Sequence, residues 1–106
     1  MSQNFKVPDL RYIEAVIVGV LLSHPAREMY GLEILEGSDG FLKRGSIYVT
    51  LQRMEEKKLL ESRQESRAKP EVGIARRVYS VTGLGERAFD GYRVKHQKLS
   101  AIIAPV

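Results

Sequence analysis

The sequence predicts a mainly α-helical domain with a small β-hairpin, and three observations predict it. Apolar residues recur at helical steps through the first 60 residues and again after residue 83. Between these segments the period changes to two, over residues 61–65 and 76–82, which indicates two strands joined by a polar tip. The order is helix, helix, helix, strand, tip, strand, helix. That order is typical of a winged helix-turn-helix followed by one long C-terminal helix.

Three helices are expected before the hairpin, at residues 10–23, 29–36 and 46–58. The first should start at Pro8-Asp9 and end at His24-Pro25, because a residue before proline avoids the helical region. The β-branched run Val16-Ile17-Val18 would also suit a strand, but the apolar pattern around it is longer than a strand and favours a helix. In the second helix, Gly31 indicates close packing against a neighbouring helix.

The third helix has two contrasting faces. Its inner stripe is apolar and leads to two leucines that close the core: Ile47, Leu51, Met54, the Lys58 stem, Leu59 and Leu60. A solvated outer face usually carries charged residues such as Glu and Lys. Here the first two outward turns carry a different mixture, close behind Lys43 and Arg44: Ser46, Val49, Gln52 and Arg53, with Tyr48 at the edge.

A long last helix is expected over residues 83–103, with Thr82 as its N-cap. One face of it carries an apolar and aromatic stripe: Ala88, Phe89, Tyr92, His96, Leu99 and Ile103. We expect residues 1–82 to form the winged helix-turn-helix domain and residues 83–106 a dimerisation helix, within one compact unit. The stripe is too apolar for a tail in water, so a second copy is the expected cover. The alternative is that the helix folds back on the first helix of its own chain.

Composition and charge limit the classes of function. The net charge is +4, and residues 43–79 carry ten Lys/Arg against five Asp/Glu, whereas residues 1–42 carry three against six. A basic centre on a small domain suggests a polyanion partner, although on charge alone a solvated basic face is an equal alternative. The absence of cysteine fits a reducing cytoplasm. We expect no signal peptide, no membrane association and a cytoplasmic location.

Catalytic and metal sites are not indicated. His24 reads as a turn residue, and His96 lies on the apolar stripe of the last helix, where a packed histidine is commoner than a ligand. No His, Cys and carboxylate spacing suggests a metal site, and nothing places Ser, His and Asp together as a triad. We therefore expect no enzyme activity and no cofactor.

DNA recognition explains the unusual outer face. The major groove is about 12 Å wide and admits one helix. Near its N-terminus such a helix needs short polar or methyl-bearing side chains for base edges and cations for phosphates. Val49 can contact a thymine methyl group, Gln52 can pair with adenine, and Arg53 with guanine or a phosphate. The alternative for Tyr48 and Val49 is burial under the wing, which is the predicted hairpin after this helix.

The polar tip between the strands is rich in cations. A basic hairpin beside a helix in the groove would follow the sugar-phosphate backbone or enter a minor groove, although hairpins are also often basic simply to protect their edges. The residues predicted to bind DNA are Lys43, Arg44, Ser46, Tyr48, Val49, Gln52, Arg53, Arg67, Lys69, Arg76 and Arg77.

Three blocks of the sequence, "YGLEIL", "GSIYVTLQRMEEKKLLES" and "ARRVYSVTGLGERAF", resemble the signature blocks of the PadR family of bacterial transcriptional regulators. The likeness covers roughly residues 10–92. It implies that Ser46, Tyr48 and the residues one turn on bind DNA, and that Arg76 and Arg77 belong to the wing. Two positions depart from the family pattern: Val49 stands where proline is frequent, and Tyr30 precedes the glycine of the second helix instead of following it.

The resemblance also implies an assembly and an effector. Small members of the family pair through one long terminal helix, so we expect a homodimer on a palindromic operator, with Phe89, Tyr92, His96, Leu99 and Ile103 at the interface. The expected function is repression of transcription. Two alternatives stay open: a winged-helix module that binds an acidic protein, and a sensor of a small aromatic molecule held in a cleft near the dimer interface, lined by Tyr12, Phe89 and Tyr92.

Overall fold

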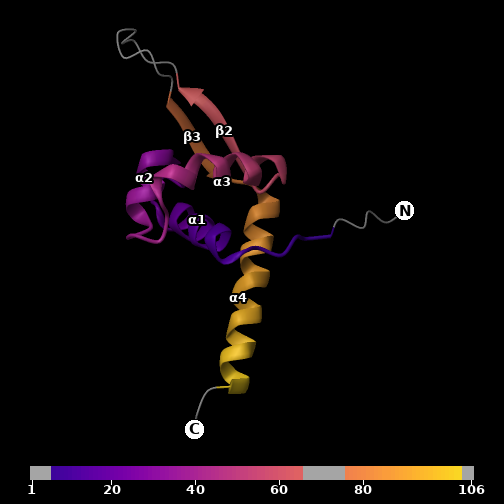
Figure 1. Cartoon of the computed structure of the whole chain (residues 1–106). Helices are drawn as coiled ribbons and strands as arrows, with labels where there is room; N and C mark the ends of the chain where they lie inside the picture. The colour runs from indigo at the N-terminus through magenta and orange to yellow at the C-terminus, as the bar shows by residue number, and fades with distance from the viewer. Residues whose placement is uncertain (1–5, 66–75, 104–106) are drawn as a thin grey trace, which may run out of the picture.

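The computed structural model describes residues 6–65 and 76–103 of the chain (Figure 1). The N-terminal helices pack together, a small sheet lies beside them, and the long C-terminal helix leaves the body (Figure 1). The elements are α1 (Tyr12–Ser23), β1 (Glu28–Tyr30), α2 (Gly31–Gly37), α3 (Arg44–Glu56), β2 (Leu60–Glu65), β3 (Arg76–Val81) and α4 (Gly83–Ile103). This is the predicted winged helix-turn-helix with a long C-terminal helix.

The sheet has three antiparallel strands in the order β1-β3-β2. The β2–β3 hairpin was predicted, and β1 was not, because residues 29 and 30 were assigned to the second helix. Met29 lies opposite Tyr79 of β3, and both side chains are buried. Three residues are too few to show strand alternation, so it is the long-range pairing with β3 that makes this segment a strand.

The core lies between the three helices and the inner face of the sheet. The inner stripe of α3 is fully buried as predicted, and Leu59 and Leu60 close the core after it. Lys58 departs from the prediction. The helix ends at Glu56, Lys58 takes a left-handed φ of 67°, and its side chain is exposed instead of lining the stripe.

The two helix starts near the site differ from the expected positions. Tyr12 begins α1, two residues later than predicted, because the carboxylate of Glu14 accepts the backbone N–H of Arg11 at 2.9 Å. Arg44 begins α3, two residues before the predicted start. The end of α1 at His24 was predicted correctly.

The start of α4 is fixed tightly to the core. The predicted cap is confirmed, since Thr82 Oγ1 accepts the N–H of Gly85 at 3.0 Å. A Cβ atom added at Gly85 would lie 2.3 Å from the carbonyl oxygen of Leu59, so the helix approaches the chain more closely than any side chain allows. Beyond its first turns α4 extends away from the other elements (Figure 1).

Candidate nucleic-acid interface

The outer face of α3 is open to solvent along its first three turns. Ser46, Gln52 and Arg53 are exposed, and Val49 is 51% exposed. The opposite stripe of the helix is fully buried, which fixes the rotation of α3 about its axis. The alternative of burial under the wing is therefore wrong for Val49, and the predicted outward set does point away from the core.

Two cations stand at the start of α3. Lys43 and Arg44 are both exposed. The first backbone N–H groups of a helix have no partner within it and carry its partial positive charge. Lys43 and Arg44 therefore add full charges to a helix end that already attracts anions.

Tyr48 is partly buried and partly exposed, so both DNA contact and packing within the chain are open to it. Its side chain is 50% exposed, and its ring rests against Gly31 at the start of α2, where an added Cβ would lie 2.6 Å from Cε1 of the tyrosine. The close packing predicted at Gly31 is thus confirmed, and the neighbour is α3. Part of the ring thus packs on α2, while half of the side chain remains exposed.

The two arginines that begin β3 point to opposite faces of the sheet, because neighbouring residues of a strand alternate. Arg77 lies on the face that meets α3. Its Nε donates to Ser62 Oγ at 3.1 Å, and Ser62 Oγ donates to Glu55 Oε2 at 2.6 Å. On the same face, burial raises the pKa of the Tyr79 hydroxyl, and the neighbouring Glu55 raises it further. This chain of contacts joins the wing to α3.

Arg76 lies on the outer face of the sheet. Its guanidinium lies 5.0 Å from the ring centroid of Tyr30, whose hydroxyl donates to Glu65. On that face Arg63 also pairs with Glu28 at 2.9 Å. The outer face therefore mixes acids and bases at the base of the wing. Arg67 and Lys69, which were predicted to bind DNA, lie outside the described residues.

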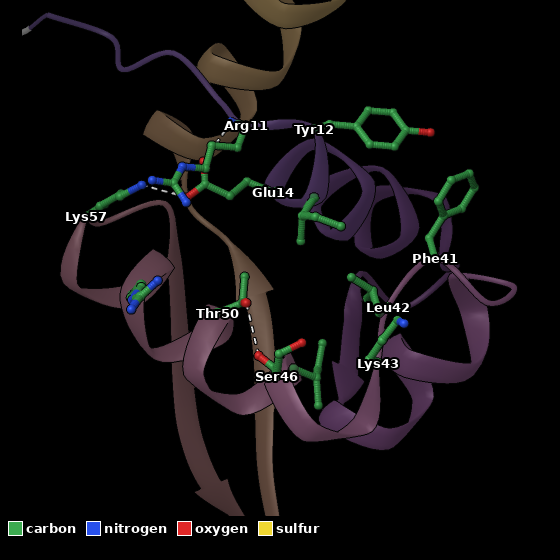
Figure 2. Close-up of a pocket in the computed structure, with 12 residues that line it drawn as sticks. Arg11, Tyr12, Glu14, Phe41, Leu42, Lys43, Ser46, Thr50 and Lys57 are labelled. Carbon is green, nitrogen blue, oxygen red and sulfur yellow. Dashed lines mark hydrogen bonds and ion pairs between the residues drawn. The ribbon is translucent and has the colours of Figure 1, made fainter.

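A groove on the other flank of α3 contains residues that the sequence reasoning missed (Figure 2). It separates α3 from the start of α1, and Arg11 and Lys57 stand on its walls with the predicted Lys43 and Arg53. Lys57 pairs with Glu14, 43 positions away along the chain. Only a three-dimensional arrangement brings such residues together, so the sequence held no local signal for the groove.

The predicted interface stripe of α4 divides into two parts. Phe89 and Tyr92 pack partly against the body of the same chain, and the ring of Phe89 touches Gly19 of α1. His96, Leu99 and Ile103 are exposed, the last two at 52% and 67%. The first part of the stripe thus folds back on α1, while the second part has no cover within the described chain.

Within residues 6–65 and 76–103, no group of three or more His, Cys, Asp or Glu side chains could hold a metal ion. In the same residues, no helix is long and apolar enough to cross a membrane.

Comparison with known proteins identifies the family. The model of the transcriptional regulator PadR-like family matches residues 20–91, which include α2, α3, the sheet and the start of α4. The chain belongs to the PadR-like family. It is therefore a DNA-binding transcriptional regulator and not an enzyme. The resemblance of the three sequence blocks is confirmed, and the winged helix-turn-helix is of the PadR type.

Solved PadR-like structures share the fold. A PadR family regulator from Clostridium difficile R20291 is 32% identical, with a TM-score of 0.63 over 87% of this chain and 91% of that one. A PadR-like regulator from Bacillus cereus is 25% identical, with a TM-score of 0.66 over 86% of each chain. PadR of Bacillus subtilis, solved in complex with operator DNA, is 18% identical, with a TM-score of 0.67 over 79% of this chain and 49% of that one. No curated protein matches the chain.

Proposed function

We propose that the chain is a homodimeric repressor that reads a palindromic operator with α3 in the major groove. The observation that carries this proposal is the outer face of α3, where exposed short polar and methyl-bearing side chains lie beside cations over a fully buried inner stripe. A PadR protein of the same fold has been crystallised with operator DNA. A dimer bound across a promoter would block access to it, so we propose repression.

Base contacts are assigned to the first turns of α3. Ser46, Val49, Gln52 and Arg53 can reach base edges, and Lys43, Arg44 and Tyr48 would hold the phosphates. Glu56 continues the same face at the end of the helix and is exposed. Its carboxylate would repel the phosphate backbone, so the reading surface should end before it.

Among the described wing residues, we propose that Arg77 contacts the DNA backbone more directly than Arg76. Arg77 faces the side of the sheet on which α3 lies, and its guanidinium donates to a neutral hydroxyl. Arg76 faces the other side and is held over the Tyr30 ring, close to Glu65. Arg67 and Lys69 lie outside the described residues and remain predicted DNA-binding residues.

The dimer is assigned to α4. Leu99, Ile102 and Ile103 are each more than half exposed on the part of the helix that leaves the body, and they lie on one side of it. Large apolar side chains grouped on one exposed helix mark an interaction surface. A second α4 related by a two-fold axis would cover this surface and place two α3 helices on one duplex.

Selection of bound duplexes from a random library tests the main proposal. The expected result is enrichment of one inverted repeat, whose half-sites are separated by about one helical turn of DNA. Binding to the selected sequence should be stronger than binding to random duplex, and both affinities should fall steeply with salt. Failure to bind duplex DNA, together with salt-sensitive capture of an acidic protein, would favour the protein-binding alternative.

A second role is supported by one observation. Tyr12, Phe89 and Tyr92 line a shallow groove of about 390 Å³ between α1 and α4, as expected for an aromatic effector site. An effector bound there would lie where α4 leaves the body. It would therefore change the spacing between the two α3 helices of the proposed dimer. Calorimetry with a panel of phenolic acids would test it, with Tyr92→Ala as the variant that should lose binding.

A further inference from the structure

The groove between α1 and α3 has a volume of about 750 Å³ and two kinds of wall (Figure 2). The side chains of Arg11, Glu14 and Lys57 converge at one end (Figure 2). Tyr12 and Phe41 stand at the other end with ring centroids 5.5 Å apart, and both are more than half exposed. The wall formed by α3 is polar where Ser46 and Thr50 line it.

Charge in the groove is strongly positive. Four cations line it, namely Arg11, Lys43, Arg53 and Lys57, whereas Glu14 is the one acidic residue among the described lining residues. The side chain of Glu14 is 5% exposed, and both of its oxygens are occupied: Oε1 accepts the backbone N–H of Arg11 at 2.9 Å and Oε2 accepts Lys57 Nζ at 2.6 Å. The acid therefore neutralises Lys57 alone.

The remaining three cations of the groove are available to a ligand. Arg11, Lys43 and Arg53 are exposed, and none of them forms an ion pair within residues 6–65 and 76–103. Three uncompensated positive charges around one concave surface favour a ligand that carries several negative charges.

The place of the groove on α3 indicates which polyanion fits. Ser46, Thr50, Arg53 and Lys57 lie on one flank of the helix, because steps of three and four keep residues on one side. Tyr48 and Glu55 lie on the opposite flank and face α2 and β2. A helix in the major groove has a phosphate backbone along each side. The wing is placed for one backbone, and the α1–α3 groove is placed for the other.

We propose that this groove binds the sugar-phosphate backbone of the DNA strand on the side of α3 away from the wing, with Arg11 as a phosphate-binding residue. The inference rests on the proposed function and extends it to α1, which the sequence reasoning left out of the interface. The two contacts would hold α3 in the groove from both sides. They carry no base specificity, so they set affinity and orientation.

Replacing Arg11 tests the proposal without disturbing the fold. Its backbone N–H makes the contact with Glu14, so Arg11→Gln removes the cation and keeps this hydrogen bond. The slope of log affinity against log salt on random duplex should flatten by about 0.9 for each phosphate that the protein no longer neutralises. Affinity for the selected operator and for random duplex should fall by the same factor at a given salt. Arg11→Lys should restore most of the slope.

Arg87→Gln is the matched control, because Arg87 is an exposed arginine of α4 that does not line the groove. Equal slopes for Arg11→Gln, Arg87→Gln and the parent would overturn the inference while leaving the proposed function intact. A parent that binds no duplex DNA would instead overturn the proposed function. A third result would also overturn the inference: thermal stabilisation by inorganic phosphate that Arg11→Gln abolishes, with an unchanged DNA slope, would mean that the groove holds a small anion.

Discussion

Ser46 and Gln52 differ from the other exposed residues of α3 in being neutral hydrogen-bonding side chains on its outer face. The hydroxyl of Ser46 and the amide of Gln52 can distinguish bases, whereas the cations around them can bind phosphates of any sequence. Substituting either by Ala should weaken operator binding by about 1–3 kcal/mol where the side chain bonds a base edge. Unfolding should hardly change, since both side chains face solvent.

Anisotropy titrations on operator and random duplex, with melting curves on the same samples, would measure both quantities. The ratio of the two affinities should shrink in each variant, and melting should stay as in the parent. If both folded variants keep the operator affinity of the parent, α3 does not read the major groove.

Gly85 and Gly91 give a paired test of packing within one helix. An added Cβ at Gly85 would lie 2.3 Å from the Leu59 carbonyl oxygen and 2.8 Å from Val81 Cγ1, whereas one at Gly91 would meet no other element of the described chain within 4 Å. Gly85→Ala should lower the free energy of unfolding by about 1–3 kcal/mol, because backbone must move. Gly91→Ala should raise it by about 0.5–1 kcal/mol, since alanine favours the helix.

Thermal melting at equal protein concentration would compare the two alanine variants with the parent. A shift of about 4–8 °C per kcal/mol is expected for a domain of this size. Opposite signs for the two variants support the close approach of α4 to the end of α3. A Gly85→Ala protein as stable as the parent would show that the helix start can move aside.

At the level of elements, the features that depend on apolar periodicity and on helix caps could be predicted from the sequence. The inner stripe of α3 and the bounds of α4 followed from apolar spacing and from the Thr82 cap. It did not predict β1, whose three residues form a strand only because β3 lies beside them. The Glu14–Lys57 pair was missed for the same reason, since neither residue has a local signal for a partner 43 positions away.

The wing gives a prediction that depends on strand alternation. Arg77→Gln should flatten the salt slope of random-duplex binding by about 0.9, because one phosphate on the α3 side of the sheet is no longer neutralised. Arg76→Gln should change the slope less, since its guanidinium stacks on Tyr30 on the other side. Loss of that stack should instead lower the melting temperature slightly, as a cation–π interaction contributes about 0.5–1 kcal/mol at an exposed site.

Salt titrations of both arginine variants and of a protein lacking Arg67, Lys69, Arg76 and Arg77 would decide the wing's role. The fourfold variant should flatten the slope most and reduce binding to all sequences alike. A slope that stays unchanged in the fourfold variant would mean that the wing does not touch DNA. Equal effects of the two single changes would contradict the assignment of Arg77 as the residue nearer to the DNA.

At the scale of the molecule, the proposed DNA-reading surface and the proposed pairing surface lie on different parts of the chain. The proposed reading surface comprises α3, the wing and the groove beside α1. The exposed half of α4 is the proposed pairing surface and points away from them (Figure 1). Such separation lets a change in pairing alter operator binding without altering any base contact. Two weak DNA-binding surfaces gain affinity from each other only when they are joined in one dimer.

Leu99 lies midway along the exposed part of α4 and tests this separation. Leu99→Asp would place a carboxylate on each side of the proposed two-fold axis. An unpaired buried charge costs several kcal/mol, so pairing should be abolished. Leu99 is 52% exposed in the single chain and lies outside its core, so the winged helix-turn-helix should keep its fold. Each monomer keeps the charge of its DNA-binding surface. It lacks the second α3 helix, which a dimer would place about 34–36 Å away in the next major groove.

Operator binding by Leu99→Asp should therefore fall far more than binding to random duplex. Sedimentation and operator titration on one preparation measure both effects, and Ala101→Asp supplies a control that adds the same charge at an exposed position two residues further along α4. The control should remain dimeric, because residue 101 is rotated about 200° from Leu99 around the helix, onto the face opposite the apolar stripe. A Leu99→Asp protein that stays dimeric, or a monomer with the operator affinity of the parent, would rule out pairing through this face of α4.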